Sequence, residues 1–237
     1  DTPSGFVQTV LTEDAGLLQV SSGILPACWL NDAVPVTSLA RAIKEATSRN
    51  AVAPAAGSHR LRRLLSERLR RKEIAAVPGS ILTTTGASHA LHLAARALAA
   101  PGDVVFVDDP GYFFLRTQLE ELGLRVVGVP RTVEGPDVDC LVRLAAEHRP
   151  KAFFTQSILH NPTGWHMSLA VCHPLVVAAE QCDLTLVEDD VYGELAGDGM
   201  ARLAQFDGLK RVVYVSGASK VLTPAIRVGF VAARPDL

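Results

Sequence analysis

Cysteine is scarce in this sequence, with four residues among 237. Cys28, Cys140, Cys172 and Cys182 form no CxxC pair and show no zinc-like spacing with histidine. Neither a disulfide framework nor a zinc knuckle is therefore indicated. This usage is typical of a protein in a reducing compartment, and we predict a cytoplasmic location.

Long apolar runs are also absent. No stretch approaches the roughly 20 continuous apolar residues of a membrane-spanning helix, and the N-terminus lacks the basic and then apolar pattern of a signal peptide. We therefore expect no membrane partner. Because the sequence starts at Asp1 rather than at methionine, we expect a processed product, a trimmed chain or a fragment.

Charge of one sign is not in excess. A formal net charge of -2 gives no electrostatic reason to expect direct binding of nucleic acid. The one basic run, His59–Lys72, alternates arginines with Leu61, Leu64, Leu65 and Leu69. That spacing favours an amphipathic helix with a solvated outer face over a nucleic-acid contact.

Several motifs that would identify an enzyme class directly are missing. The sequence contains no GxGxxG, no Gly-Lys-Ser/Thr and no GxSxG. These absences exclude a dinucleotide loop, a P-loop and the nucleophile elbow of serine hydrolases.

The sequence does contain a regular alternation of short β-branched runs with helical patterns, each run bounded by Gly, Pro or Asp. This alternation predicts an α/β fold, with a mostly parallel sheet covered by helices on both faces. The expected strands are 80–86, 103–111, 124–130, 151–156, 184–190, 211–216 and 227–233, and the expected helices are 87–100, 112–123, 138–149 and 168–181, the last bent at Pro174.

The predicted organisation has two parts. Residues 1–36 have a proline and glycine texture with isolated hydrophobic residues, and we expect an extended arm there. Residues 37–237 show no interior linker, so we expect them to form one large domain. Binding chemistry on such sheets gathers where the strands end.

The first polar strand end is the turn formed by Gly86, Ala87 and Ser88 at the start of a predicted helix. Free backbone N–H groups and the helix dipole favour an anion such as phosphate at that position. The alternative is an ordinary helix start that is capped by Ser88.

The next two strand ends carry Tyr112 and Asn161. Tyr112 opens a helix and can stack on a planar ligand, or it can be a packing residue. Asn161 lies in the segment "HNPTG", where its amide can bind a ligand or can simply belong to the turn.

The last two strand ends carry acidic residues and a lysine. Glu188, Asp189 and Asp190 are consecutive, and such a cluster can hold Mg²⁺, pair with a cation on a ligand or cap the following turn. Lys220 follows the small-residue stretch "SGAS", whereas most lysines are solvated surface charges.

Taken in order, "TGAS", "PGY", "HNPTG", "EDDVY" and "SK" followed by "RVGF" resemble the fold-type-I, pyridoxal-phosphate-dependent aminotransferases. The similarity runs collinearly from about Leu17 to the end. It is strongest to the aminotransferase-like effector domains of the GntR-type transcriptional regulators called MocR.

The resemblance implies a set of roles. Lys220 would form an imine, the internal aldimine, with the cofactor aldehyde and then shuttle a proton, and a lowered pKa caused by burial and by Arg227 would leave it a free amine. Asp189 would pair with the ring nitrogen. Further residues would hold the phosphate or contact the ring, namely Gly86, Ala87, Ser88, Ser219 and Arg227 for the phosphate and Tyr112, Asn161 and Tyr192 for the ring.

The sequence departs from the family pattern at three places. Gly217 lies where the family has Ser or Thr, and Val52 lies where it places a tyrosine that reaches the partner subunit's cofactor. Both differences favour weaker cofactor binding. The sequence also ends before the small domain that supplies the family's arginine for the substrate carboxylate, and we expect that domain to be missing from this chain.

Two functions compete on this scaffold. The first is an aminotransferase that moves an amino group between an amino acid and a 2-oxo acid, acting as a homodimer. The second is a domain that senses the cofactor or an amino acid in a GntR/MocR-type regulator, with DNA bound only by a domain outside this chain. A third class is a Mg²⁺ enzyme that uses Glu188, Asp189 and Asp190.

Overall fold

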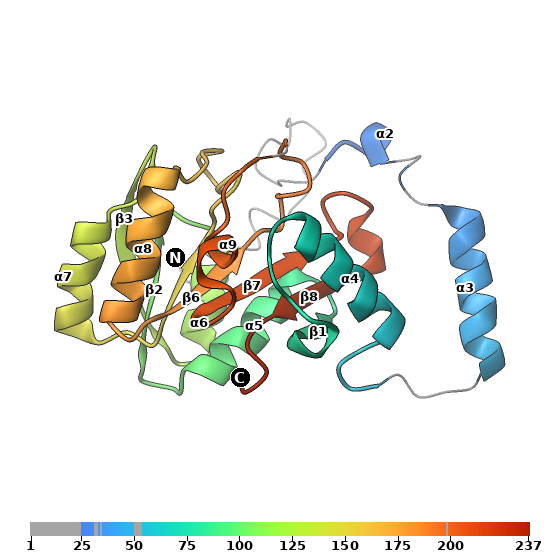
Figure 1. The fold of residues 1–237 in the computed structure, drawn as a ribbon, viewed down its shortest axis with the longest axis horizontal. Helices are drawn as coiled ribbons and strands as arrows, with labels where there is room; N and C mark the ends of the chain where they lie inside the picture. The colour runs from blue at the N-terminus through green and yellow to red at the C-terminus, as the bar shows by residue number, and fades with distance from the viewer. Residues whose placement is uncertain (1–24, 31–32, 34, 50–53, 198) are drawn as a thin grey trace.

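The computed structural model describes residues 25–30, 33, 35–49, 54–197 and 199–237. Its centre is an eight-stranded sheet with the order β1-β8-β7-β6-β5-β2-β3-β4 (Figure 1). The strands are β1 (Ile81–Thr84), β2 (Val104–Asp109), β3 (Arg125–Thr132), β4 (Gly135–Pro136), β5 (Ala152–Thr155), β6 (Thr185–Asp189), β7 (Val212–Gly217) and β8 (Gly229–Ala232).

Strand direction divides the sheet into a parallel centre and antiparallel margins. The pairs β2–β3, β2–β5, β5–β6 and β6–β7 are parallel. In contrast, β8 is antiparallel to both β1 and β7, and β4 is antiparallel to β3. The predicted mostly parallel sheet is therefore confirmed, with the direction of β8 as an addition.

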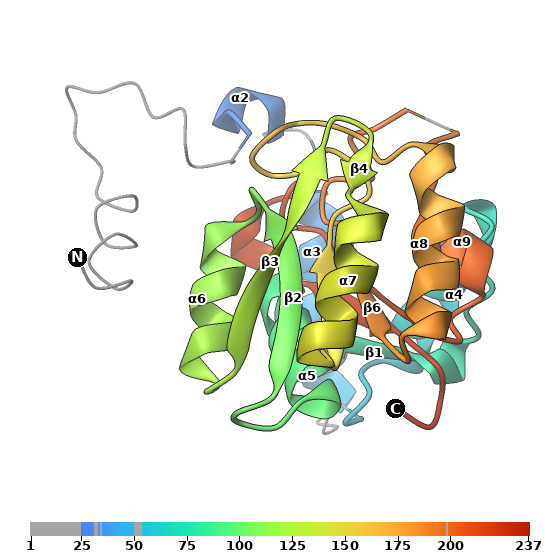
Figure 2. The same cartoon turned by 90° about the vertical axis from the view of Figure 1, so that its left-hand side faces the viewer.

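Helices cover both faces of the sheet, as predicted. One face packs against α4 (His59–Arg71), α7 (Val138–His148), α8 (Leu169–Gln181) and α9 (Leu203–Asp207), whose buried residues share one apolar cluster. The other face packs against α5 (Ala87–Leu98) and α6 (Phe113–Glu121), which share a second cluster. Figure 2 shows α6 and α7 on opposite sides of β2 and β3.

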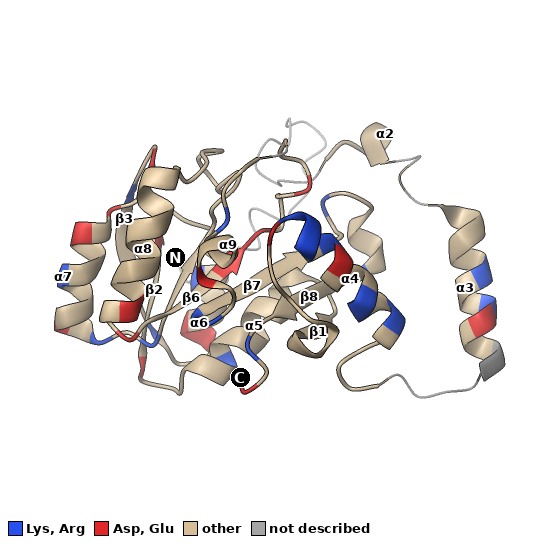
Figure 3. Cartoon of the chain, in the orientation of Figure 1, with Lys and Arg blue, Asp and Glu red and all other residues tan. Residues whose placement is uncertain are grey.

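The basic run forms α4, an amphipathic helix as expected. Leu69 is buried in the core, whereas Arg60, Arg63 and Arg70 are exposed. Figure 3 shows how basic residues concentrate on this helix. The apolar stripe therefore holds α4 on the sheet while its arginines face solvent.

The N-terminal region contains two helices that the sequence analysis did not predict, α2 (Ala27–Leu30) and α3 (Val36–Arg49). The side chains of Val36, Leu39 and Ile43 on α3 are exposed. Residues 1–24 of the expected arm lie outside the described residues, so the arm remains a prediction. Among the described residues, none belongs to a helix long and apolar enough to cross a membrane.

The antiparallel direction of β8 positions the segment that carries Lys220. The chain leaves the sheet at Gly217 and returns at Gly229, with a short 3₁₀ turn at Pro224–Ile226, and these two glycines are paired in the sheet register. The return needs a glycine, because a Cβ at Gly229 would lie 2.4 Å from the carbonyl carbon of Gly86. The segment between Gly217 and Gly229, which carries Lys220, therefore lies at the edge of the sheet where β5 and β6 end.

Candidate functional site

A cavity of about 350 Å³ lies at this edge of the sheet. Its volume falls within the range of small-molecule sites, roughly 300–1,000 Å³. The structure brings nine of the ten cofactor-binding candidates into its walls, namely Ala87, Ser88, Tyr112, Asn161, Asp189, Tyr192, Ser219, Lys220 and Arg227. The tenth, Gly86, lies against the Arg227 guanidinium.

One end of the cavity is built for an anion. Gly86 is the N-cap residue of α5, with a φ of 92°, and the first N–H groups of this helix have no partner within the helix. The Nη2 of Arg227 donates to the Thr85 carbonyl over 3.3 Å, and a Cβ at Gly86 would lie 2.6 Å from that nitrogen. Glycine therefore allows a guanidinium to lie directly over a helix N-terminus, where both favour negative charge.

The alternative in which Ser88 caps this helix is wrong. Gly86 occupies the N-cap position, and Ser88 is the second residue of α5. Its side chain lines the cavity instead. The two hydroxyls of Ser88 and Ser219 therefore stand in the same cavity as the Arg227 guanidinium.

Asp189 contributes a carboxyl group to the wall of the same cavity. Its side chain is 4% exposed, and burial raises its pKa to about 6. Hydrogen bonds from Gln156 Nε2 at 2.9 Å and from the Val191 backbone N–H at 3.2 Å oppose that rise. The site thus holds a carboxyl group whose ionisation depends on what binds next to it.

Lys220 lies near Asp189 and over the ring of Tyr192, with 5.3 Å from its Nζ to the ring centroid. Burial lowers the pKa of Lys220, while the charge of Asp189 opposes that effect. The expected direction is thus reached through burial, since Arg227 directs its guanidinium at Thr85 and Gly86. A lysine amine with a lowered pKa is a better nucleophile near neutral pH.

Tyr112 packs as one of its two alternatives predicted, and its place in the cavity is compatible with the other, stacking on a planar ligand, which stays a prediction. It lines the cavity and its ring also packs edge-on against Phe114, with 5.7 Å between ring centroids. Burial raises its pKa to about 12, so the phenol stays neutral. Asn161 also lines the cavity, with its backbone N–H donating to Gln156 Oε1 over 2.7 Å.

The Mg²⁺ hypothesis is not supported, because the three consecutive acidic residues contact different groups. Glu188 accepts from the backbone N–H groups of Leu203 and Ala204 at the start of α9, at 2.8 and 2.9 Å. Asp190 accepts from Arg202 Nε at 2.7 Å. In the part of the chain that the structure describes, no three His, Cys, Asp or Glu side chains form a group that could hold a metal ion.

Sequence reasoning did not assign a role to several cavity residues, namely Leu91, Phe113, Phe114, Gln156, Val191 and Pro224. Gln156 had a usable signal, because it is the first residue beyond the carboxyl end of β5. The rule that selected the acidic cluster at the end of β6 applies equally to Gln156. Val52 lies outside the described residues. Gly217 lines a different cavity.

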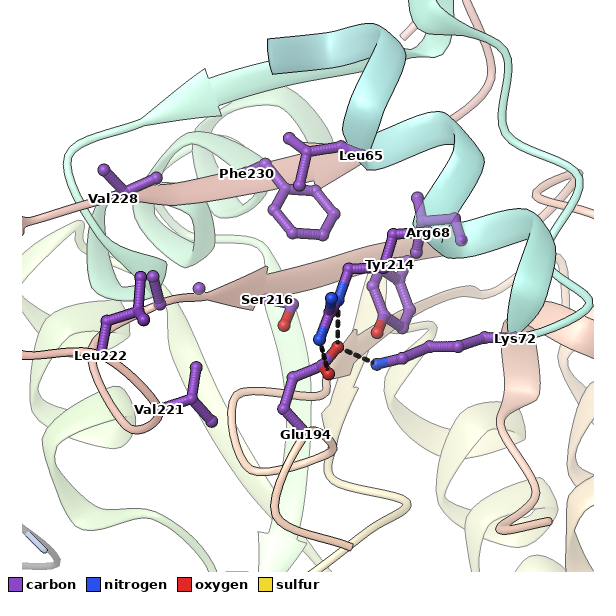
Figure 4. Close-up of a pocket in the computed structure, with 13 residues that line it drawn as sticks. Leu65, Arg68, Lys72, Glu194, Tyr214, Ser216, Val221, Leu222, Val228 and Phe230 are labelled. Atoms are coloured by element: carbon purple, nitrogen blue, oxygen red, sulfur yellow. Dashed lines mark hydrogen bonds and ion pairs between the residues drawn. The ribbon is translucent and has the colours of Figure 1, made fainter. Parts of the chain in front are cut away.

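That second cavity, of about 210 Å³, lies between α4 and strands β7 and β8 (Figure 4). Its walls include Leu65, Val228 and Phe230. At one end Glu194 forms ion pairs with Lys72, at 2.6 Å, and with Arg68. The two cavities share a wall, because Ala218, Val221 and Leu222 face this one, while Ser219 and Lys220 face the other.

Comparison with known proteins places this geometry in a family. The family model described as aminotransferase class I and II matches residues 17–237. The chain belongs to the class I and II aminotransferase family. The predicted resemblance is thereby confirmed at the level of the family.

The individual relatives include both a transcriptional regulator and an aminotransferase. An uncharacterised HTH-type transcriptional regulator of Escherichia coli, YdcR, is 33% identical over 83% of this chain and 43% of its own length. Aromatic-amino-acid aminotransferase 1 of Thermococcus litoralis is 30% identical over 95% of this chain and 56% of its own length. The chain thus spans about half the length of the curated relatives it matches.

A solved structure is also similar. It is LysN, an α-aminoadipate aminotransferase from Thermus thermophilus in complex with N-(5'-phosphopyridoxyl)-L-leucine. It aligns with a TM-score of 0.83 and 26% identity, and the alignment covers 100% of this chain and 59% of LysN. The fold predicted from the sequence is therefore that of the aminotransferases.

Proposed function

We propose that this chain binds pyridoxal 5'-phosphate through Lys220 and serves in amino transfer between an amino acid and a 2-oxo acid. The observation that carries the proposal is the convergence of three charged groups, Lys220, Asp189 and Arg227, on one cavity. Family membership and the phosphopyridoxyl ligand of LysN support the same cofactor.

The residues present fit this cofactor. A phosphate dianion suits the Arg227 guanidinium and the open N-terminus of α5, which Gly86 leaves uncovered. A protonated ring nitrogen suits the buried carboxylate of Asp189. The ring face suits Tyr112, which is aromatic and neutral.

Each residue has a definable task when the cofactor is bound. Pyridoxal phosphate supplies an aldehyde that condenses with an amine, with loss of water, and a pyridinium ring that accepts an electron pair. Burial lowers the pKa of Lys220 and so favours its neutral amine, whose Nζ would carry a proton to and from the substrate α-carbon. Asp189 holds a proton at the ring nitrogen, and Arg227 anchors the phosphate.

A second function has its own support. The similarity to YdcR and to other HTH-type regulators favours a domain that senses the cofactor or an amino acid, with DNA bound elsewhere in a longer protein. Amino acids or 2-oxo acids are the proposed ligands in both cases. We further propose a cytoplasmic homodimer, and a large domain at residues 37–237 that is preceded by an arm at residues 1–36.

The experiment titrates the chain with pyridoxal phosphate, follows absorbance, reduces the mixture with borohydride and maps the labelled peptide. We expect one label per chain, on Lys220, and none in Lys220→Ala. Lys210→Ala, which removes an exposed lysine, is the matched control and should label fully. Absence of label on wild-type Lys220 overturns the proposal.

A second measurement separates the enzyme from the sensor. The loaded chain is mixed with a panel of amino acids, and the release of 2-oxo acid is assayed over many turnovers. Continuous release in the presence of an amino-group acceptor supports the aminotransferase. A spectral change without release supports the sensing domain.

A further inference from the structure

Two residues proposed to contact the cofactor ring, Asp189 at the ring nitrogen and Asn161, come from separate elements. Asp189 ends β6, and Asn161 lies in the loop that follows β5. If both residues contact one bound ring, the two elements must keep a constant separation, because small displacements of a positioned group reduce the reaction rate.

One side chain, Gln156, contacts both groups. Its Nε2 donates to Asp189 Oδ2 at 2.9 Å, and its Oε1 accepts from the Asn161 backbone N–H at 2.7 Å. The orientation of the amide is not arbitrary, since a backbone N–H can meet only the oxygen end. Gln156 is 5% exposed, so water does not compete freely for these bonds.

Gln156 is itself anchored from behind. Its backbone N–H donates to Asp108 Oδ2 over 3.2 Å. The same carboxylate oxygen accepts from Thr155 Oγ1 at 2.8 Å and from Arg131 Nη1 at 3.1 Å, and all of these groups are buried. The amide therefore projects into the cavity from a buried ionic network rather than from a mobile loop.

We infer that Gln156 is a positioning residue that sets the Asp189 carboxylate and the Asn161 turn relative to each other. The inference rests on the proposed cofactor function, because the alignment of Asp189 with Asn161 affects binding only if both contact the cofactor ring. It goes beyond that function by assigning the alignment of the site to a residue that need not touch the reacting atoms.

An amide suits this task better than another polar side chain of similar size. It offers one donor and one acceptor and does not titrate. Its donated bond favours the ionised form of Asp189 and thereby opposes the rise in pKa that burial causes. Loss of this bond therefore extends the protonated form of Asp189 to higher pH.

The test uses two variants that separate the two contacts. Gln156→Glu keeps an acceptor for Asn161 but loses the donor to Asp189 and sets two carboxyl groups side by side. Gln156→Met has a similar volume and removes both contacts. Gln181→Ala, at the exposed end of α8, is the matched control. Circular dichroism checks that each variant folds.

The readout is the dissociation constant of pyridoxal phosphate as a function of pH, measured by absorbance. We expect the acid limb of binding in Gln156→Glu to move up by about one pH unit or more, because neighbouring carboxyls share a proton. In Gln156→Met we expect affinity to fall about tenfold or more across the range. The control should follow wild type.

Two failures are distinguishable. If wild type forms no borohydride-stable label on Lys220, the proposed function fails and the inference fails with it. If wild type is labelled and both Gln156 variants keep the affinity and the acid limb of wild type, only the inference is overturned.

Discussion

Two charged regions lie on either side of the segment Gly217–Leu222, and their partners differ. In the second cavity the charges meet each other, since Glu194 pairs with Arg68 and Lys72, and nearby Asp190 pairs with Arg202. In the Lys220 cavity, the hydrogen bonds of Asp189 and Arg227 go to uncharged groups. We infer that the ion pairs around the second cavity stabilise the fold, whereas Arg227 and Asp189, which interacts electrostatically with Lys220, are placed to meet a charged ligand.

The strongest test of this difference between the two regions is to neutralise Asp190 and Asp189 separately. Asp190→Asn leaves Arg202 and Tyr214 facing a neutral amide in the interior. We expect the free energy of unfolding to fall by roughly 3–5 kcal/mol, as measured by urea denaturation. The ability to label Lys220 should persist in the fraction that remains folded.

Asp189→Asn should behave in the opposite way. Burial raises the pKa of Asp189 from 3.8 to about 6. Without a bound cofactor, its charge therefore lowers the free energy of unfolding by on the order of 3 kcal/mol at neutral pH. We expect this variant to be at least as stable as wild type but to bind pyridoxal phosphate weakly. A large loss of stability in Asp189→Asn would contradict the division between the two regions.

The pH dependence of stability offers the next test. Burial raises the folded-state pKa values of Glu188 and Asp189 to about 7 and about 6. Between their unfolded and folded pKa values these two carboxyl groups hold more protons in the folded chain, so their contribution to stability falls as pH rises from about 4 to about 7. Buried His160, whose pKa is lowered from 6.5 to about 3, acts in the opposite direction below about pH 6.5 and reduces this slope. Denaturation at several pH values should show this slope, and Glu188→Gln should flatten its upper part.

Arg227→Gln is expected to have a smaller, ligand-specific effect. The affinity for pyridoxal phosphate should fall about 10- to 100-fold, as for the loss of a charge-assisted hydrogen bond. The affinity for pyridoxal, which lacks the phosphate, should hardly change. Equal losses for both ligands would show that Arg227 does not bind the phosphate.

The smallest effect should come from an ion pair in neither region. Arg63 and Glu67 are 54% and 43% exposed on the outer face of α4. Arg63→Ala should change the free energy of unfolding by less than about 1 kcal/mol. Thermal denaturation together with cofactor titration should reveal no difference from wild type beyond that size.

Much of the fold was predictable because its signals are local. Periodicity identified most strands and most helices of the sheet region, since apolar spacing directly reflects the buried face. The short helix α9 and strand β4 were not predicted. α3 was missed, because its apolar residues Val36, Leu39 and Ile43 are exposed in a proline-bounded region. The direction of β8 was not predictable, since strand pairing depends on contacts between distant segments.

The candidate site was predictable in part, as the fold was. Position at strand ends drew attention to Lys220 and to the acidic cluster Glu188–Asp190, and the family resemblance then singled out Asp189. Glu188 and Asp190 were grouped with Asp189 because they are consecutive, although side chains alternate between the faces of a strand and these two serve the fold. Gln156 was not predicted, although its position directly after β5 is as informative as that of the acidic cluster after β6.

The pairing of β1 with β8 has a consequence for the order of folding. Thr84 and Gly229 are register partners, although most of the described chain lies between them. Gly86 and Arg227 can therefore meet only after the intervening strands and helices have assembled, because closing so long a loop is a late and slow event. In a refolding experiment, the cofactor absorbance should therefore appear later than the helical signal in circular dichroism, and it would report the final step of folding.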